Sequence, residues 1–179
     1  MDVLHRYFFA LQPPEPVIRR AGSLRDVFAE AGGGVRDDRL HVTLGITDDY
    51  AERPAAVVDR MLGIGDAVDA EPFALSFDRL SGNGRTIALR PSRTAPGLTA
   101  LHRQIDAQMR YWNVRRPGWS FNPHMTLVYR PHQEFLRPIE ALAWEAAKLV
   151  LIHSLVGRTQ HRVIGRWPLR RRQMELLGV

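Results

Sequence analysis

The clearest feature of the sequence is a strict alternation of apolar and polar residues from residue 39 to residue 46. Leu40, Val42, Leu44 and Ile46 alternate with Arg39, His41, Thr43 and Gly45. A period of two is typical of a β-strand that has one face against a core and one face toward solvent. We therefore predict a half-buried strand over these eight residues, with its apolar set pointing inward.

Similar local patterns predict the other elements of the chain. Strands are predicted over residues 3–11, 73–80, 85–90, 124–130, 145–156 and 162–169. The second and third of these flank Ser81-Gly82-Asn83-Gly84, a strong hairpin signal. Apolar positions at steps of three and four predict helices over residues 16–31 and 53–68, and from a cap at Thr94 to Trp112. The stretch that contains Pro131 and Pro138 is expected to be a connection.

The order of these elements repeats within the chain. Residues 8–44 and 86–127 each contain a strand, a helix, a short loop with glycine or proline, and a second strand. The two repeats end on similar phrases, His41-Val42-Thr43-Leu44 and, 83 positions later, His124-Met125-Thr126-Leu127. We expect an α+β fold in which two strand-helix-strand units form a bilobal, pseudo-twofold repeat, with antiparallel sheets lining a central cleft. Residues 1–179 are expected to form a single domain of two intertwined lobes.

The repeated phrase suggests chemistry as well as structure. Residues i and i+2 of a strand share a face, so each phrase presents one imidazole and one hydroxyl together. A single His-x-Thr is more often structural, but two copies in repeated contexts favour one site made of His41, Thr43, His124 and Thr126. Two histidines can supply the base and the acid that cleavage of a phosphodiester needs, because imidazole titrates near neutrality. Threonine hydroxyls can bind the phosphate oxygens, each bond contributing roughly 1.5–3 kcal/mol.

Composition limits the classes of protein to which the chain can belong. The formal charge is +6, and every basic residue except Lys148 is arginine. This composition permits a nucleic-acid or nucleotide partner, but GC-rich coding would explain it equally well. The absence of cysteine excludes disulfides, a thiolate nucleophile and thiolate metal sites. No carboxylate or third histidine stands at ligand spacing near the paired histidines, so we expect no metal. No apolar run is long enough to cross a membrane and no cleavable leader is evident, so a cytoplasmic location is expected.

The paired motifs resemble those of the two-histidine (2H) phosphoesterase superfamily, in its LigT-like branch of RNA 2',3'-cyclic phosphodiesterases, long called 2'-5' RNA ligases. The resemblance extends over nearly the whole chain, because residues 6–11 are similar to the first strand of that branch, residues 122–127 to its second motif and residues 163–169 to its closing strand. It implies that His41 is the general acid that protonates the departing 3' oxygen. His124 would then be the base that activates water. The residues themselves leave these two roles open.

The chain departs from the pattern of this branch at two positions. Tyr129 stands where the branch often has arginine, and Arg130 follows it. Strand alternation would place Arg130 on the face of His124 and Thr126, so we predict that Arg130 contacts phosphate or RNA. His161 stands where a tyrosine is common. One interpretation places it in the lining of the cleft, but we expect an exposed strand histidine there.

Aromatic and basic residues outside the motifs leave more than one interpretation open. The resemblance implies that the face carrying Phe8 and Ala10 points toward the cleft, where Phe8 would support a base or ribose. A role for Phe8 in the core is equally consistent with the pattern. Arg115, Arg116 and Trp119 lie in the loop before the second motif. They are equally suited to stacking on unpaired bases and to a structural role.

We therefore predict metal-independent hydrolysis of an RNA terminal 2',3'-cyclic phosphate to a 2'-phosphate by two-histidine acid/base catalysis, without a cofactor. The expected partners are RNA or oligonucleotide ends that bear the cyclic phosphate, bound by a monomer with no membrane association. One alternative is a phosphodiesterase that acts on other cyclic or 2'-5' linked nucleotides. A second is a non-catalytic RNA- or nucleotide-binding module, and a third is the reverse reaction, ligation.

Overall fold

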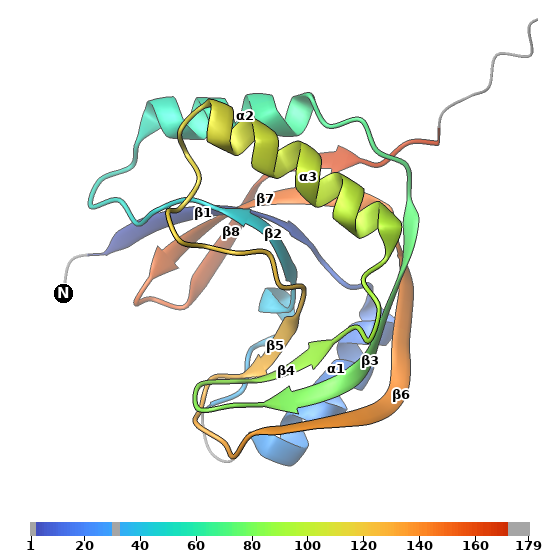
Figure 1. The fold of residues 1–179 in the computed structure, drawn as a ribbon. Helices are drawn as coiled ribbons and strands as arrows, with labels where there is room; N and C mark the ends of the chain where they lie inside the picture. The colour runs from blue at the N-terminus through green and yellow to red at the C-terminus, as the bar shows by residue number, and fades with distance from the viewer. Residues whose placement is uncertain (1–2, 30–32, 172–179) are drawn as a thin grey trace, which may run out of the picture.

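Two four-stranded antiparallel sheets form the framework in the computed structural model, which describes residues 3–29 and 33–171 (Figure 1). The first sheet has the order β2-β1-β7-β8, with β1 Leu4–Leu11, β2 Val42–Ile46, β7 Lys148–Val156 and β8 Gln160–Pro168. The second has the order β5-β4-β3-β6, with β3 Phe73–Gly82, β4 Ile87–Arg90, β5 Met125–Val128 and β6 Phe135–Ala146. Helices α1 Glu15–Phe28, α2 Ala55–Asp66 and α3 Pro96–Tyr111 cover the sheets, and a 3-10 turn, η1, spans Asp37–Arg39. The predicted α+β fold with antiparallel sheets is confirmed.

The internal repeat is visible in how the strands pair. In the first unit β1 pairs with β2, and in the second unit β4 pairs with β5, both antiparallel. Each pairing has a register shift directly before an alanine, and that alanine lies opposite the threonine of the motif: Ala10 opposite Thr43, and Ala88 opposite Thr126. The repeat thus extends to the detail of a bulge, which places each motif strand in the same way relative to its partner.

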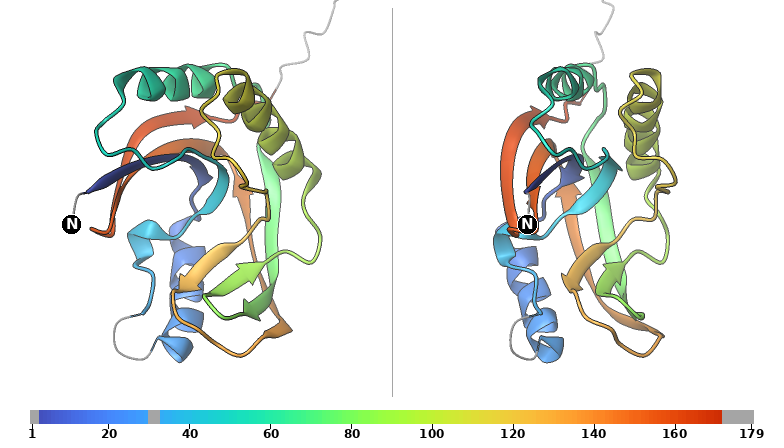
Figure 2. Two further views of the ribbon diagram at one scale, coloured as in Figure 1. Left: turned by 60° about the vertical axis from the view of Figure 1, so that its left-hand side comes forward. Right: turned by 90° about the vertical axis from the view of Figure 1, so that its left-hand side faces the viewer.

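The helices of the two repeats exchange sheets. Helix α1 follows β1 of the first sheet but packs against β5 and β6 of the second. Helix α3 follows β4 of the second sheet, yet it packs on β2 of the first sheet as well as on β3. The two helices consequently lie at opposite ends of the molecule (Figure 2). Each motif strand is therefore covered by the helix of the other repeat, which connects the two halves through their cores.

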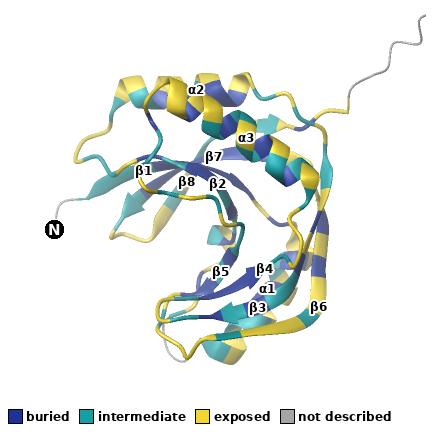
Figure 3. Cartoon of the chain, viewed as in Figure 1, coloured by how far each residue is buried: buried dark blue, intermediate teal, exposed yellow. Residues whose placement is uncertain are grey.

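Both faces of β1 are buried, and each face packs against a different set of residues. Tyr7, Phe9 and Leu11 belong to the main core, whereas Phe8 and Ala10 pack on the opposite face with Val150 and Ile152 of β7. The two faces agree with the alternation predicted from the sequence. Buried positions are concentrated where the sheets meet the helices, and the outer faces of the helices are exposed (Figure 3).

The two motif strands are shorter than the sequence predicts. The strand expected over residues 39–46 begins at Val42, after the η1 turn, and the strand expected over residues 124–130 is Met125–Val128. Both motif histidines therefore lie directly before a strand. Leu40, which precedes β2, is nonetheless buried in the core, which explains why the alternation extends beyond the start of that strand.

Other predicted elements also differ from the structure. The connection expected around Pro138 is most of strand β6, and the long strand expected over residues 145–156 is divided between β6 and β7. Proline is tolerated because β6 is an edge strand and Pro138 lies beside a register shift in its pairing with β3. Helix α3 is capped by Ala95 without a side-chain bond, so the cap expected at Thr94 is wrong.

Two sequence predictions concern the ends of the chain and of helix α1. The end of α1 predicted at residue 31 lies outside the described residues, and the helix in the structure ends at Phe28. That residues 1–179 form one domain stays a prediction.

Within residues 3–29 and 33–171, no helix combines the length and apolar character needed to cross a membrane.

Candidate active site

The side chains of the two motifs meet in one small cavity between the sheets. His41 lies directly before β2 and Thr43 within it, and His124 lies directly before β5 and Thr126 within it. All four line a cavity of about 60 Å³, together with Val35, Arg39 and Tyr129. A phosphate group is of this order of size. The structure thus brings together the four residues that the repeated phrase predicts to converge.

Apolar residues between the functional positions hold the two strands in place. Val42 and Leu44 alternate with Thr43 on β2, and Met125 and Leu127 alternate with Thr126 on β5; all four apolar residues are 0% exposed. Because strand residues alternate between faces, burying these side chains fixes the threonines toward the cavity.

Both histidine rings are held in the same way. The Nδ1 atom of His41 lies 2.6 Å from the carbonyl oxygen of Arg39, and Nδ1 of His124 lies 2.7 Å from the carbonyl oxygen of Asn122. In each case the acceptor is two residues before the histidine. A carbonyl oxygen can only accept, so Nδ1 carries the hydrogen, and Nε2 of the neutral ring has the free lone pair. The two Nε2 atoms are therefore the ring positions that remain available for proton transfer.

The surroundings favour the neutral form of both rings. Desolvation in the cleft is the main cause that lowers the pKa of His41 to about 4, and the charges of His124 and Arg39 act in the same direction. Desolvation also lowers the pKa of His124, with a smaller contribution from Arg90. The hydrogen bonds to the backbone carbonyls oppose both shifts. An anion between the rings would raise these pKa values, so substrate binding and protonation of one ring are coupled.

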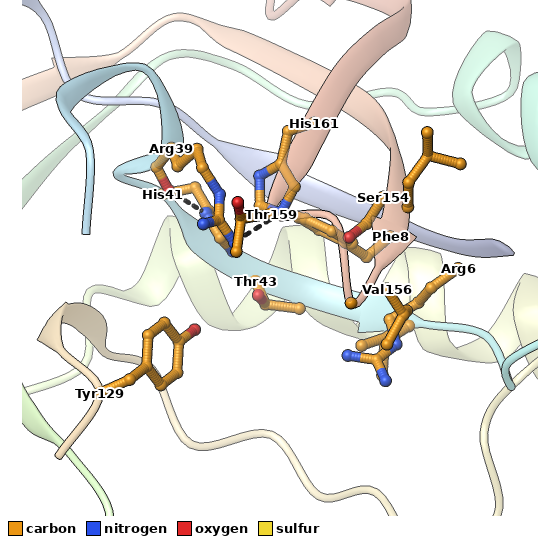
Figure 4. Close-up of a pocket in the computed structure, with 13 residues that line it drawn as sticks. Arg6, Phe8, Arg39, His41, Thr43, Tyr129, Ser154, Val156, Thr159 and His161 are labelled. Atoms are coloured by element: carbon orange, nitrogen blue, oxygen red, sulfur yellow. Dashed lines mark hydrogen bonds between the residues drawn. The ribbon is translucent and has the colours of Figure 1, made fainter. Parts of the chain in front are cut away.

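A second, larger cavity shares part of its lining, including His41, with the first. Figure 4 shows the residues that line this larger cavity. Its volume is about 290 Å³, and it shares Arg39, His41, Thr43 and Tyr129 with the smaller cavity. Phe8 lies in its wall, with its ring centre 4.8 Å from that of His41. The two cavities together form a phosphate-sized space that opens into a space large enough for a sugar or base.

The sequence matches the family model described as the 2'-5' RNA ligase superfamily over residues 13–158. The chain belongs to the 2'-5' RNA ligase superfamily. This assignment agrees with the 2H phosphoesterase motifs and indicates phosphodiester hydrolysis or ligation as the general chemistry. No curated protein matches the sequence closely enough to count as a relative.

Solved structures similar to this superfamily member share its fold at low sequence identity. A structure described as a phosphoesterase has a TM-score of 0.80 and 21% identity, covering 94% of this chain and 99% of its own. LigT of E. coli complexed with 3'-AMP has a TM-score of 0.78 and 22% identity over the same shares of the two chains. TT0787 of Thermus thermophilus has a TM-score of 0.76 and 23% identity, covering 92% of this chain and 98% of its own.

In this member of the superfamily, Arg130 does not take the place in the site that strand alternation predicts. The register between β4 and β5 shifts between Thr126 and Val128, and β5 ends at the buried Val128, so the alternation from His124 does not extend to residue 130. The Arg130 guanidinium donates to the carbonyl oxygen of Phe28, at the end of α1, and Arg130 lines neither cavity. Tyr129 lines both cavities instead and is 59% exposed at their rim.

His161 lies in the site, although the sequence gives no local sign of it. We expected an exposed strand histidine, but its ring lines the larger cavity, 5.5 Å from the ring of His41 and 5.4 Å from that of Phe8. It reaches this position because β8 pairs with β7 in a register that sets His161 opposite Ser154, another residue of the cavity wall. Desolvation is the main cause that lowers the pKa of His161 to about 4.

The basic and aromatic residues of the loop before the second motif are engaged within the protein. Arg115 forms an ion pair with Asp106, and Arg116 forms one with Asp49, both at 2.5 Å. The Trp119 ring contacts His102 edge-on. None of Arg115, Arg116 and Trp119 lines either cavity, which favours the structural role among the two that the sequence left open.

A protein metal site needs several ligand side chains arranged around one point. Among the described residues, no group of three or more histidine, cysteine, aspartate or glutamate side chains is arranged to hold a metal ion. We therefore assign no residues to a metal.

Proposed function

We propose that this protein hydrolyses the 2',3'-cyclic phosphate at the end of an RNA or oligonucleotide and leaves a 2'-phosphate, without a metal. The observation that carries the proposal is the pair of histidines, each held at Nδ1 by a backbone carbonyl, on the wall of one phosphate-sized cavity. The superfamily supports phosphodiester chemistry in general. The formal charge of +6 is compatible with a polyanionic substrate.

In the proposed reaction, Nε2 of one histidine removes a proton from water as its oxygen attacks phosphorus. The bond from phosphorus to the ribose 3' oxygen breaks, and Nε2 of the other, protonated histidine gives its proton to that oxygen. The hydroxyls of Thr43 and Thr126 donate to the non-bridging oxygens, where charge increases in the transition state.

The position of the larger cavity supports the assignment of the two roles. Attack and departure are in line, so water and the 3' oxygen lie on opposite sides of phosphorus. The leaving oxygen remains part of the ribose, and the cavity of about 290 Å³ that can accept a ribose adjoins His41. His41 is therefore proposed as the acid and His124 as the base, as the family resemblance implies.

The proposal predicts turnover of an oligonucleotide that ends in a 2',3'-cyclic phosphate when EDTA is present. Phosphorus NMR of the product should show a 2'-phosphate, because His41 protonates the 3' oxygen. A 2'-5' linked dinucleotide, assayed in parallel, tests the alternative substrate class.

Three results would contradict parts of this proposal. Absence of turnover would overturn the proposed activity, and loss of activity in EDTA would overturn its metal independence. A 3'-phosphate product would overturn the placement of the 3' oxygen beside the acid.

A further inference from the structure

The η1 turn before the first motif directs one arginine into the site. Its two acidic residues pair with other arginines. Asp37 forms an ion pair with Arg25 at 2.5 Å, and Asp38 accepts two hydrogen bonds of 2.8 and 3.0 Å from Arg36. The third residue, Arg39, has no carboxylate partner among the residues that the structure describes. Its side chain lines both the smaller and the larger cavity.

The contacts of Arg39 leave hydrogen-bond donors unused inside the wall of the cavity. Its Nη2 lies 3.4 Å from Nε2 of His161. Arginine can only donate, so Nε2 accepts and the neutral His161 ring carries its hydrogen on Nδ1. Within the described part of the chain, both Nε of Arg39 and Nδ1 of His161 are buried without a hydrogen-bond partner. Buried donors without acceptors are costly, so the Arg39 and His161 pair has unused hydrogen-bonding capacity beside the cavities.

The other arginines close to the site, Arg6 and Arg90, donate hydrogen bonds to protein groups. Arg6 lines the larger cavity, but Asp49 binds its guanidinium through two bonds of 2.6 and 2.7 Å. Arg90 donates to Ser81 and Asn122 and lines neither cavity. Among the described residues, Arg39 is thus the one arginine in the wall of the phosphate-sized cavity.

We propose that Arg39 binds a non-bridging oxygen of the substrate phosphate, and that His161 is a positioning residue that holds the Arg39 guanidinium between the two cavities. The proposal rests on the proposed function, because it places the scissile phosphate between His41 and His124. Two neutral histidines and two threonines supply no permanent positive charge, whereas arginine keeps its charge at every pH where an enzyme works. The carbonyl oxygen of Arg39 also holds Nδ1 of His41, so one residue places both the ring and the charge.

Arg39→Gln tests the phosphate contact while keeping the backbone carbonyl that holds His41. Loss of one charge-assisted bond should raise the Kd of inorganic phosphate, and lower kcat/KM for the cyclic phosphate, each by roughly 10- to 100-fold. Arg39→Lys keeps the charge without the planar fork and should lose less. Arg19→Gln is the matched control, because Arg19 is exposed on α1, pairs with Glu15 and lines neither cavity. It should leave both quantities within about threefold of the wild type. Circular dichroism of each variant should match that of the wild type, which checks that the variants are folded.

Variants of His161 test its positioning role. His161→Phe removes the acceptor for Arg39 and should raise the Kd of phosphate by roughly three- to tenfold. His161→Gln supplies a side-chain oxygen as acceptor and should restore most of the binding. Equal losses in the Phe and Gln variants would overturn the positioning role.

The Kd of phosphate, measured beside turnover, distinguishes failure of the Arg39 contact from failure of the proposed activity. Wild-type turnover with unchanged phosphate Kd and kcat/KM in Arg39→Gln would overturn the Arg39 contact and leave the proposed function standing. Absence of wild-type turnover would overturn the proposed function, and a weaker phosphate complex in Arg39→Gln would still support an anion contact at this residue.

Discussion

Replacement of His41 or His124 by alanine should lower kcat for a 2',3'-cyclic phosphate by about 10²- to 10⁴-fold, the range expected for loss of a general acid or base. Both rings contribute through Nε2 to the same bond-breaking event, so the double variant should be little worse than the more damaged single variant. The measurement is single-turnover kinetics of the two single variants and the double variant. Thermal unfolding should show all three to be folded, because both rings line the cavity and are only partly buried.

His132→Ala is the matched control for these variants. His132 is exposed, lines neither cavity and makes its hydrogen bond to a local carbonyl. Its kcat should be that of the wild type within about twofold. If His41→Ala and His124→Ala bind nucleotide less tightly but keep wild-type turnover, the site is a phosphate-binding module and the catalytic roles are wrong.

Replacement of Leu44 or Leu127 by alanine should lower the stability of the fold and have little effect on kcat. Each leucine directly follows the threonine of its motif and is 0% exposed, so truncation should lower the free energy of unfolding by about 2–5 kcal/mol. The functional side chains remain, so kcat of the folded fraction should stay within about tenfold of the wild type. Urea denaturation measures the first quantity, and kinetics at a temperature well below Tm measures the second.

Leu136→Ala provides the comparison for the core variants. Leu136 is 66% exposed on β6, so its truncation should change the free energy of unfolding by no more than about 0.5 kcal/mol. A loss below about 1 kcal/mol in both Leu44→Ala and Leu127→Ala would contradict the view that the motif strands are fixed by their buried residues.

The parts of the fold that sequence predicts well are those with a local cause. Alternation places Phe8 and Phe9 on opposite faces of β1, and the structure confirms it. The repeated phrase predicts that His41 and His124 share a site because the strand and helix before each phrase also repeat. The exchange of α1 and α3 between sheets has no local pattern, since any apolar stripe can pack on either sheet.

The residues of the site that sequence misses depend on longer-range geometry. Arg39 alternates with the apolar set together with His41 and Thr43, but no motif marks it as a site residue. His161 enters the larger cavity through the register between β7 and β8. Arg130 leaves the site because β5 stops at Val128. Alternation predicts the side on which a residue lies only as far as the strand extends, and strand ends are set by tertiary contacts.

Titration of the histidine rings by NMR, with and without inorganic phosphate, distinguishes one shared site from two separate ones. Without phosphate, His41 and His124 should have pKa values below the usual 6.5, and the pKa of His41 should be about 4. With phosphate, the resonances of both rings should move along one saturation curve with a single Kd, and both pKa values should rise. A response from only one ring, or two different Kd values, would contradict a single two-histidine phosphate site.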